Sequence, residues 1–121
     1  MSKRIFALDD DERMCKLMEL HLSKHGYEVK TQSSPMLTDR DVLRFGPDLV
    51  ILDVQMPWLT GDTMADIFQF GFEITPKIIF FSGLAASELK AMADDKEVDG
   101  FVCKSEGMEA LLEKVRAVIG S

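Results

Sequence analysis

The chain alternates short apolar runs rich in branched residues with longer stretches in which apolar residues recur every three or four positions. The apolar runs predict five strands, at residues 4–8, 27–30, 49–52, 77–82 and 99–104. The helical periodicity predicts five helices that follow these strands, at about residues 11–25, 36–45, 62–71, 86–95 and 108–119. No repeat, linker or low-complexity tract interrupts this order.

Strands that alternate with helices predict a parallel sheet with helices on both faces, because right-handed crossovers place the helices there. The run LVIL at 49–52 is apolar on both faces, which is typical of a central strand. The run YEVK at 27–30 is more polar and suits an edge strand. The fold class is therefore α/β, a doubly wound (βα)₅ arrangement. The length of 121 residues suits a single domain over 1–121.

Composition limits the class of partner and the location. A formal net charge of −7 argues against nucleic-acid binding by this domain and favours proteins or cations as partners. The first apolar run is too short for a signal peptide, and no window has the length of a membrane span, so we expect a cytoplasmic protein. Cys15 and Cys103 lie far apart without further ligands at metal-site spacing, which favours reduced thiols over a disulfide or zinc site.

Four of the predicted strands end in polar residues that carry chemistry. Asp9 and Asp10 follow the first strand and Asp53 follows the third, while Ser82 ends the fourth and Lys104 the fifth. Taken singly, each has an ordinary explanation as a turn former, a helix cap or a surface residue. Because the carboxyl ends of parallel strands meet at one edge of a sheet, where ligands bind, we expect these five side chains to lie together.

The joint arrangement indicates a particular chemistry. Three neighbouring carboxylates repel one another and tend to hold protons unless a cation lies among them. Mg²⁺ suits this demand, since it takes oxygen ligands and keeps several waters. A lysine and a hydroxyl beside the cation would bind an incoming anion. The pattern therefore predicts a site for a phosphoryl group beside a metal.

Four motifs carry a resemblance to a known family. They are the acidic doublet in FALDDDERM, the segment LVILDVQMPWLTG, the strand IIFFSG and the strand GFVCKS. In this order and spacing they resemble the receiver domains of bacterial two-component response regulators, over essentially the whole chain. The resemblance implies a flavodoxin-like sandwich with strand order 2-1-3-4-5 and a role in phosphorelay signal transduction.

The resemblance also assigns residues to the phosphorylation site. It implies that Asp53 is phosphorylated on its carboxylate and helps to bind Mg²⁺. It further implies that Asp10 ligates the metal directly, that Asp9 does so mainly through water, and that the main-chain carbonyl of Gln55 supplies another ligand.

Three further residues would respond to the phosphoryl group. The resemblance implies that Lys104 forms an ion pair with the phosphoryl oxygens and that Ser82 hydrogen-bonds to them. Phe101 matches the aromatic position that commonly swings inward when Ser82 moves. The expected output is altered affinity of the surface formed by the fourth helix, fifth strand and fifth helix for a partner.

The implied partners are a sensor histidine kinase or phosphotransfer protein as donor and a downstream protein or attached output domain as target. Neither a membrane nor direct nucleic-acid binding is expected, and a phosphorylation-dependent dimer is left open. The domain would promote its own phosphorylation and dephosphorylation without turning over an external substrate, so its status as an enzyme is also open. The alternative is a receiver-like interaction module controlled by partner binding without phosphorylation. A hydrolase ranks third, since nothing supplies a substrate pocket or general base.

The chain departs from the family pattern after Lys104. The family commonly has a proline there, often in the cis form, whereas this chain has Ser105. A non-proline cis bond costs about 3 kcal/mol, and the sequence leaves a trans bond and a strained cis bond both open. Gln55 and Leu84 occupy the two variable positions that influence hydrolysis of the acyl phosphate in this family. A free-standing receiver and an excised one would both have this sequence.

Overall fold

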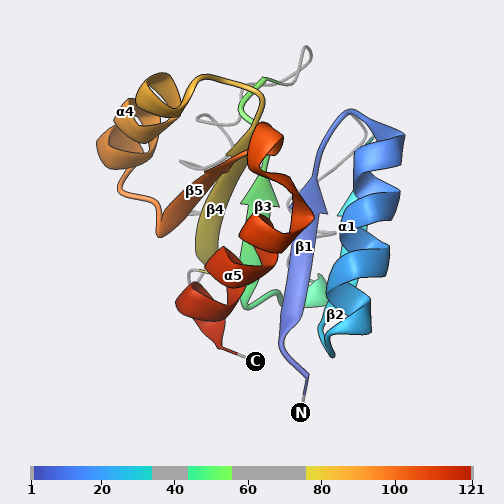
Figure 1. The fold of residues 1–121 in the computed structure, drawn as a ribbon. Helices are drawn as coiled ribbons and strands as arrows, with labels where there is room; N and C mark the ends of the chain where they lie inside the picture. The colour runs from blue at the N-terminus through green and yellow to red at the C-terminus, as the bar shows by residue number, and fades with distance from the viewer. Residues whose placement is uncertain (1, 34–43, 56–75, 121) are drawn as a thin grey trace.

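The structure is a computed structural model that describes residues 2–33, 44–55 and 76–120. Within these residues, five parallel strands form one sheet in the order β2-β1-β3-β4-β5 (Figure 1). The strands are β1 (Arg4–Leu8), β2 (Glu28–Gln32), β3 (Leu49–Leu52), β4 (Lys77–Ser82) and β5 (Gly100–Cys103). The predicted fold class, the strand order and the edge position of the second strand are confirmed.

Two strands, β2 and β5, differ from the prediction in their boundaries. β2 begins one residue later and extends to Gln32, because Thr31 and Gln32 pair with Ala7 and Leu8 of β1. The pairing partner therefore extends the strand into polar residues, which periodicity alone does not show. β5 is shorter than predicted, because Lys104 begins a turn instead of ending the strand.

The described helices are α1 (Glu12–Lys24), α4 (Ala86–Lys96) and α5 (Gly107–Ile119), with a short 3₁₀ turn, η1 (Lys104–Glu106), before α5. The side chain of Asp11 caps α1 by accepting a hydrogen bond from the Arg13 N–H at 2.9 Å. Just after α1, Gly26 has a φ of +94°, a conformation that favours glycine. The helices predicted at 36–45 and 62–71 lie outside the described residues, except for residues 44 and 45, which are helical.

The sheet divides the core into two clusters. In β3, Leu49 and Ile51 belong to the cluster under α1 and α5, whereas Val50 and Leu52 belong to the cluster under α4 (Figure 1). The same alternation holds in β1 and β4, as expected for strands whose successive side chains point to opposite faces. Both faces of the central strands are therefore buried, and the polar residues are left for the strand ends.

Strand register decides which of these polar residues are neighbours. Leu8, the last residue of β1, pairs with Leu52, the last residue of β3. The Asp53 N–H continues the ladder by donating to the Leu8 carbonyl at 3.1 Å. Asp9 and Asp53 therefore leave the sheet side by side.

Cys15 and Cys103 are both free, as the sequence predicts, and both are buried. None of the helices in the described ranges combines the length and the apolar character that a membrane crossing requires.

A single buried hydroxyl ties the end of α5 to the start of β2. The Tyr27 hydroxyl donates to the Gly120 carbonyl at 2.6 Å, and the tyrosine is almost fully buried. This hydrogen bond joins residues that are 93 positions apart in the sequence.

Replacing this hydroxyl tests how much the link contributes. We expect Tyr27→Phe to lower the free energy of unfolding by about 1 kcal/mol, because the Gly120 carbonyl loses its donor. Urea denaturation would measure the change. The control is Leu20→Ala, at a side chain that is 72% exposed, where a change below about 0.5 kcal/mol is expected. An unchanged denaturation midpoint for Tyr27→Phe would contradict the assignment.

Candidate functional site

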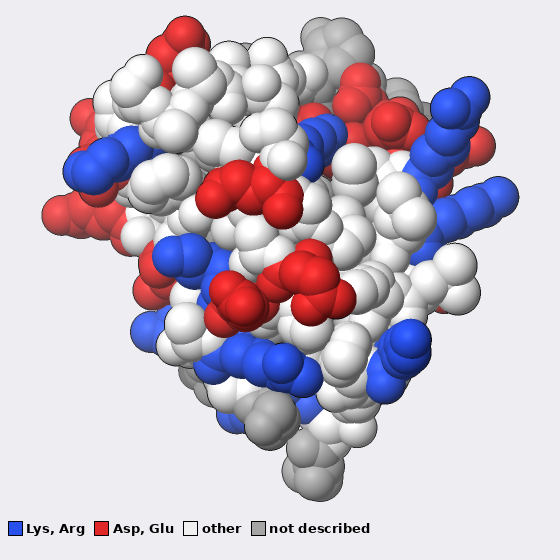
Figure 2. All heavy atoms as spheres, in the orientation of Figure 1, with Lys and Arg blue, Asp and Glu red and all other residues white. Residues whose placement is uncertain are grey.

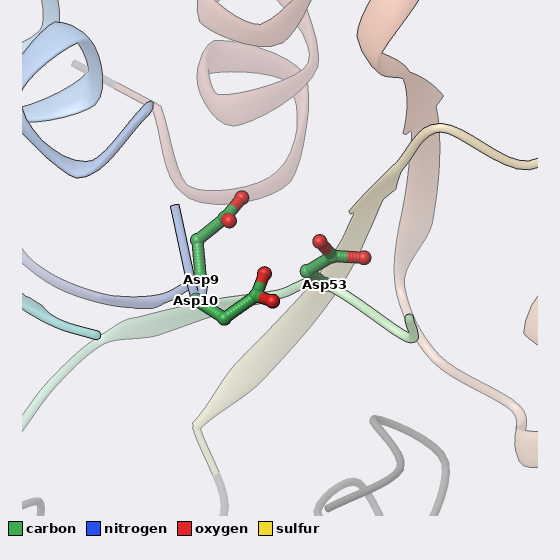
Figure 3. A group of neighbouring side chains, drawn as sticks. All are labelled: Asp9, Asp10 and Asp53. Carbon is green, nitrogen blue, oxygen red and sulfur yellow. The ribbon is translucent and has the colours of Figure 1, made fainter. Parts of the chain in front are cut away.

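Three aspartates gather at the carboxyl edge of the sheet. Asp9 and Asp10 follow β1 and Asp53 follows β3, and their side chains lie close together (Figure 3). One carboxylate oxygen from each residue lies within 4.8 Å of the others. Asp9 is 1% exposed and Asp53 4% exposed, whereas Asp10 is open to solvent. Two of the three carboxylates are thus held in the protein interior.

Lys104 supplies the positive charge between the two buried carboxylates. Its Nζ atom lies 2.7 Å from Asp9 Oδ2 and 2.8 Å from Asp53 Oδ2. Lys104 follows β5, so its side chain extends past the end of β4 to reach residues that follow β3 and β1. The structure therefore brings these three predicted site residues into direct contact.

The environment shifts the pKa values of this cluster. Burial raises the pKa of Asp9, and this effect outweighs the hydrogen bonds from Lys104 and from the Asp11 N–H, which lower it. Burial lowers the pKa of Lys104, but the hydrogen bonds to Asp53 and Asp9 outweigh burial and raise it overall. The ammonium therefore stays charged at neutral pH, while burial makes ionisation of Asp9 more costly than that of an exposed carboxyl group.

The charges in this cluster do not balance. Three carboxylates and one ammonium leave two negative charges uncompensated when all are ionised. The candidate donors are all oxygen atoms, the type that hard divalent cations prefer. The acidic cluster therefore has the ligand chemistry of a Mg²⁺ site.

Ser82 lies beside this cluster as a fully buried residue. Its hydroxyl donates to Gln55 Oε1 at 3.3 Å and accepts a hydrogen bond from the Leu84 N–H at 3.4 Å. The backbone N–H of Gln55 donates to Asp53 Oδ1 at 2.9 Å. A Cβ on Gly83 would lie 3.2 Å from Gln55 Oε1, so the glycine leaves room for this side chain. Gln55 thus contacts both Asp53 and Ser82.

The side-chain contact of Gln55 with Ser82 was not predicted from the sequence, which pointed only to the main-chain carbonyl of Gln55. No motif links these positions, because they are 27 residues apart and meet only through the sheet. Pairing of β3 with β4 brings the two strand ends together.

Phe101 lies in β5, half-buried and paired in register with Phe80 of β4. It packs against the cluster under α4, together with Met92 and Leu84. It lies on the strand that leads to Lys104, but its ring is not part of the charged cluster.

The turn after β5 resolves the question raised by Ser105. The described residues contain no cis peptide bond, so the Lys104–Ser105 bond is trans. Residues 104–106 form the turn η1, in which Glu106 Oε2 accepts a hydrogen bond from the Cys103 N–H at 3.0 Å. Glu106 was not among the site residues predicted from the sequence. The spacing of Cys103 and Glu106, three positions apart, matches a capping box and could have indicated it.

Comparisons with known proteins agree with this geometry. The family model for the response regulator receiver domain matches residues 5–116. Over 116 residues the chain is 30% identical to the uncharacterized transcriptional regulatory protein YvcP of Bacillus subtilis. The matched segment covers 96% of this chain and 48% of YvcP. It is 28% identical to the transcriptional regulatory protein KdpE of Mycobacterium tuberculosis, and this match covers 95% of this chain and 50% of KdpE. The chain spans about half the length of these curated relatives.

Solved structures show the same fold. The signal receiver domain of a response regulator from Bermanella marisrubri has a TM-score of 0.86 and 27% identity, with 98% of this chain and 99% of that chain covered. The chemotaxis protein CheY4 of Vibrio cholerae has a TM-score of 0.84 at 23% identity, with 98% and 100% covered, and supports the fold alone. From the family match and the arrangement of its strands, this chain belongs to the response regulator receiver domain family.

Proposed function

We propose that this receiver accepts a phosphoryl group on the carboxylate of Asp53, from a histidine kinase or a phosphotransfer protein. The observation that carries this proposal is the position of Lys104 Nζ, which lies within 2.8 Å of both Asp53 and Asp9 in an otherwise acidic cluster. An ammonium at this point would offset the charge that a phosphoryl group adds.

The reaction is a transfer between two nucleophiles. An oxygen of the Asp53 carboxylate attacks phosphorus while the bond from phosphorus to the donor's imidazole nitrogen breaks. The electron pair leaves with the imidazole, which takes up a proton. The product is an acyl phosphate on Asp53.

The residues around Asp53 have separate roles in this proposal. Lys104, which lies 2.8 Å from Asp53 Oδ2, would move from this carboxylate to the phosphoryl oxygens attached to it. Asp9, Asp10, Asp53 and the main-chain carbonyl of Gln55 would hold Mg²⁺. When bound, Mg²⁺ supplies positive charge that offsets the repulsion between the carboxylate and an anionic donor.

Ser82 and Phe101 would convert the added group into a change of packing. Ser82 now donates to Gln55 Oε1, and it would give up this acceptor to donate to a phosphoryl oxygen. Because Ser82 is fully buried, its displacement frees volume in the interior, which Phe101 would fill. The two packings would have different surfaces at β5.

The proposed readout is the surface formed by α4, β5 and α5. A groove of about 280 Å³ lies on the part of this surface formed by β5 and α5, and its lining includes Phe101, Ala110 and Lys114. Figure 2 shows acidic side chains over α5 in the middle of the view and basic side chains along the edge formed by α1. Because Phe101 lines the groove, a change in its packing would alter one wall of a partner site.

The target is a downstream protein or an output domain. The relatives named above are transcriptional regulatory proteins about twice as long as the matched segment, which supports an output domain as the recipient of the signal. Residues 1–121 would form the receiver unit, in a cytoplasmic protein whose two free thiols suit a reducing compartment.

An interaction module that never carries a phosphoryl group is not favoured. Such a module would not need Lys104 to bridge two buried carboxylates, since burying these charges is costly. The acidic cluster, the lysine and the buried hydroxyl of Ser82 are all present, as phosphoryl transfer requires.

Intact mass provides the direct test of phosphorylation. On incubation with Mg²⁺ and a small phosphodonor, we expect the native chain to gain one phosphoryl group that base removes, because acyl phosphates are base-labile. Asp53→Ala should gain none. Asp94→Asn, at an exposed carboxylate of α4, is the control and should be phosphorylated like the native chain. Absence of added mass on the native chain, with Mg²⁺ shown to bind, would leave the interaction module as the better account.

Burial of Asp9 predicts a pH-dependent cost in stability. Because its pKa is raised, the folded state holds this proton more tightly than the unfolded chain. Stability therefore falls as pH rises from the ordinary carboxyl value through the raised one. Without divalent cations, we expect Asp9→Asn to be more stable than the native chain at neutral pH, with the difference shrinking in acid.

Denaturation with urea in the presence of a chelator, at neutral and acid pH, measures this difference. Asp10→Asn is the matched control, since this neighbouring carboxylate is open to solvent and its replacement should change stability less. A less stable Asp9→Asn protein at neutral pH would show that the ion pair with Lys104 outweighs burial.

A further inference from the structure

We infer that Glu106 is a positioning residue for Lys104. Its side chain restrains the turn in this chain, where a proline after the lysine would otherwise restrain the backbone. The inference rests on the proposed function, because it concerns the lysine that would bind the phosphoryl group. It is carried by the hydrogen bonds of the turn between β5 and α5.

Hydrogen bonds close the turn that carries Lys104 at both ends. At its start, Glu106 Oε2 accepts from the Cys103 N–H at 3.0 Å. At its end, the Gly107 N–H donates to the Lys104 carbonyl, and Gly107 has a φ of +89°, in the region that favours glycine. The bond from the Cys103 N–H depends on the Glu106 side chain, whereas the reciprocal bond of the capping box, from the Glu106 N–H to the Cys103 side chain, does not.

This side-chain bond matters because the turn has few other restraints. β5 is an edge strand, so β4 is its only neighbour in the described sheet. The turn is three residues long, which limits the number of backbone hydrogen bonds within it. Ser105 follows Lys104 through a trans bond, and serine leaves its own φ free where a proline would fix it.

The observed position of Lys104 requires two simultaneous contacts of its side chain. Its Nζ must reach both Asp9 and Asp53, which come from two different strands, with contacts of 2.7 and 2.8 Å. A lysine side chain has many rotamers, so a loosened backbone at Lys104 would reduce the fraction of molecules in which both contacts form. Small displacements of a reacting group lower rates steeply.

Glu106 itself is outside the charged cluster. Its carboxylate is not among the three that gather at the strand ends, and the residue is exposed. α5 is anchored separately by Leu111, Leu112 and Val115, which are buried under the sheet. Loss of the Glu106 hydrogen bond should therefore loosen Lys104 while leaving the packing of α5 intact.

The test uses two substitutions at the position and one control. Glu106→Ala removes the acceptor, whereas Glu106→Gln keeps an oxygen that can accept from the Cys103 N–H. Glu113→Ala removes an equivalent negative charge from an exposed position of α5. The measured quantity is the rate constant of phosphorylation by a small phosphodonor with Mg²⁺, followed by intact mass, together with the urea midpoint of each protein.

We expect Glu106→Ala to lower the rate constant by about fivefold, as for the loss of one ordinary hydrogen bond. Glu106→Gln and Glu113→Ala should stay within about twofold of the native rate, with urea midpoints close to the native one. Glu106→Ala should lose no more stability than one hydrogen bond contributes, about 1 kcal/mol. A native rate in Glu106→Ala would overturn the inference. Equal slowing in Glu106→Gln or Glu113→Ala would also overturn it, because the effect would then come from the loss of a negative charge. A large loss of stability in Glu106→Ala would overturn it too, because the slowing would then follow from partial unfolding.

A second measurement does not depend on phosphorylation. Lys104 competes with any cation for Asp9 Oδ2, so a loosened lysine should let Mg²⁺ alone bind several-fold more tightly in Glu106→Ala than in Glu106→Gln. Equal Mg²⁺ affinities would also overturn the inference. If the native chain takes up no phosphoryl group, the proposed function fails, and this measurement still decides the role of Glu106.

Discussion

The contact on which the site depends is the ammonium of Lys104 between two buried carboxylates. Asp9 and Asp53 are both almost fully buried, and two such charges side by side would be strongly unfavourable without a cation between them. The lysine allows the fold to form with these groups at the ends of adjacent strands. It also makes the site responsive, since anything that attracts or replaces the ammonium changes the balance among the remaining charges.

The sheet makes this contact possible. Register between β1 and β3 places Asp9 and Asp53 side by side, and the side chain of Lys104, from the turn after β5, reaches both of them. The apolar strands therefore act as a fixed frame for a small polar network. The network itself is held by a few directional contacts from Gln55 and Glu106.

Sequence patterns predicted the sheet and the polar residues at its strand ends, but not the hydrogen bonds among the side chains of the site. Alternating apolar runs and helical periods predict the sheet, because each pattern reflects burial along a single element. The five polar residues at strand ends could also be predicted, since parallel strands bring their carboxyl ends to one edge. The contact of Ser82 with Gln55 could not, because it depends on rotamers of residues from two strands. The length of β2 was missed for a similar reason, since pairing with β1 extends it into polar sequence.

The division of the core by the sheet has a consequence for how this domain can change over evolutionary time. Residues under α1 and α5 form one cluster and residues under α4 form another, with the strands between them. Effects of substitutions on groups that share no contacts tend to be additive. Substitutions in one cluster should therefore change stability largely independently of substitutions in the other, so that the packing on one side of the sheet can diverge without matching changes on the other side.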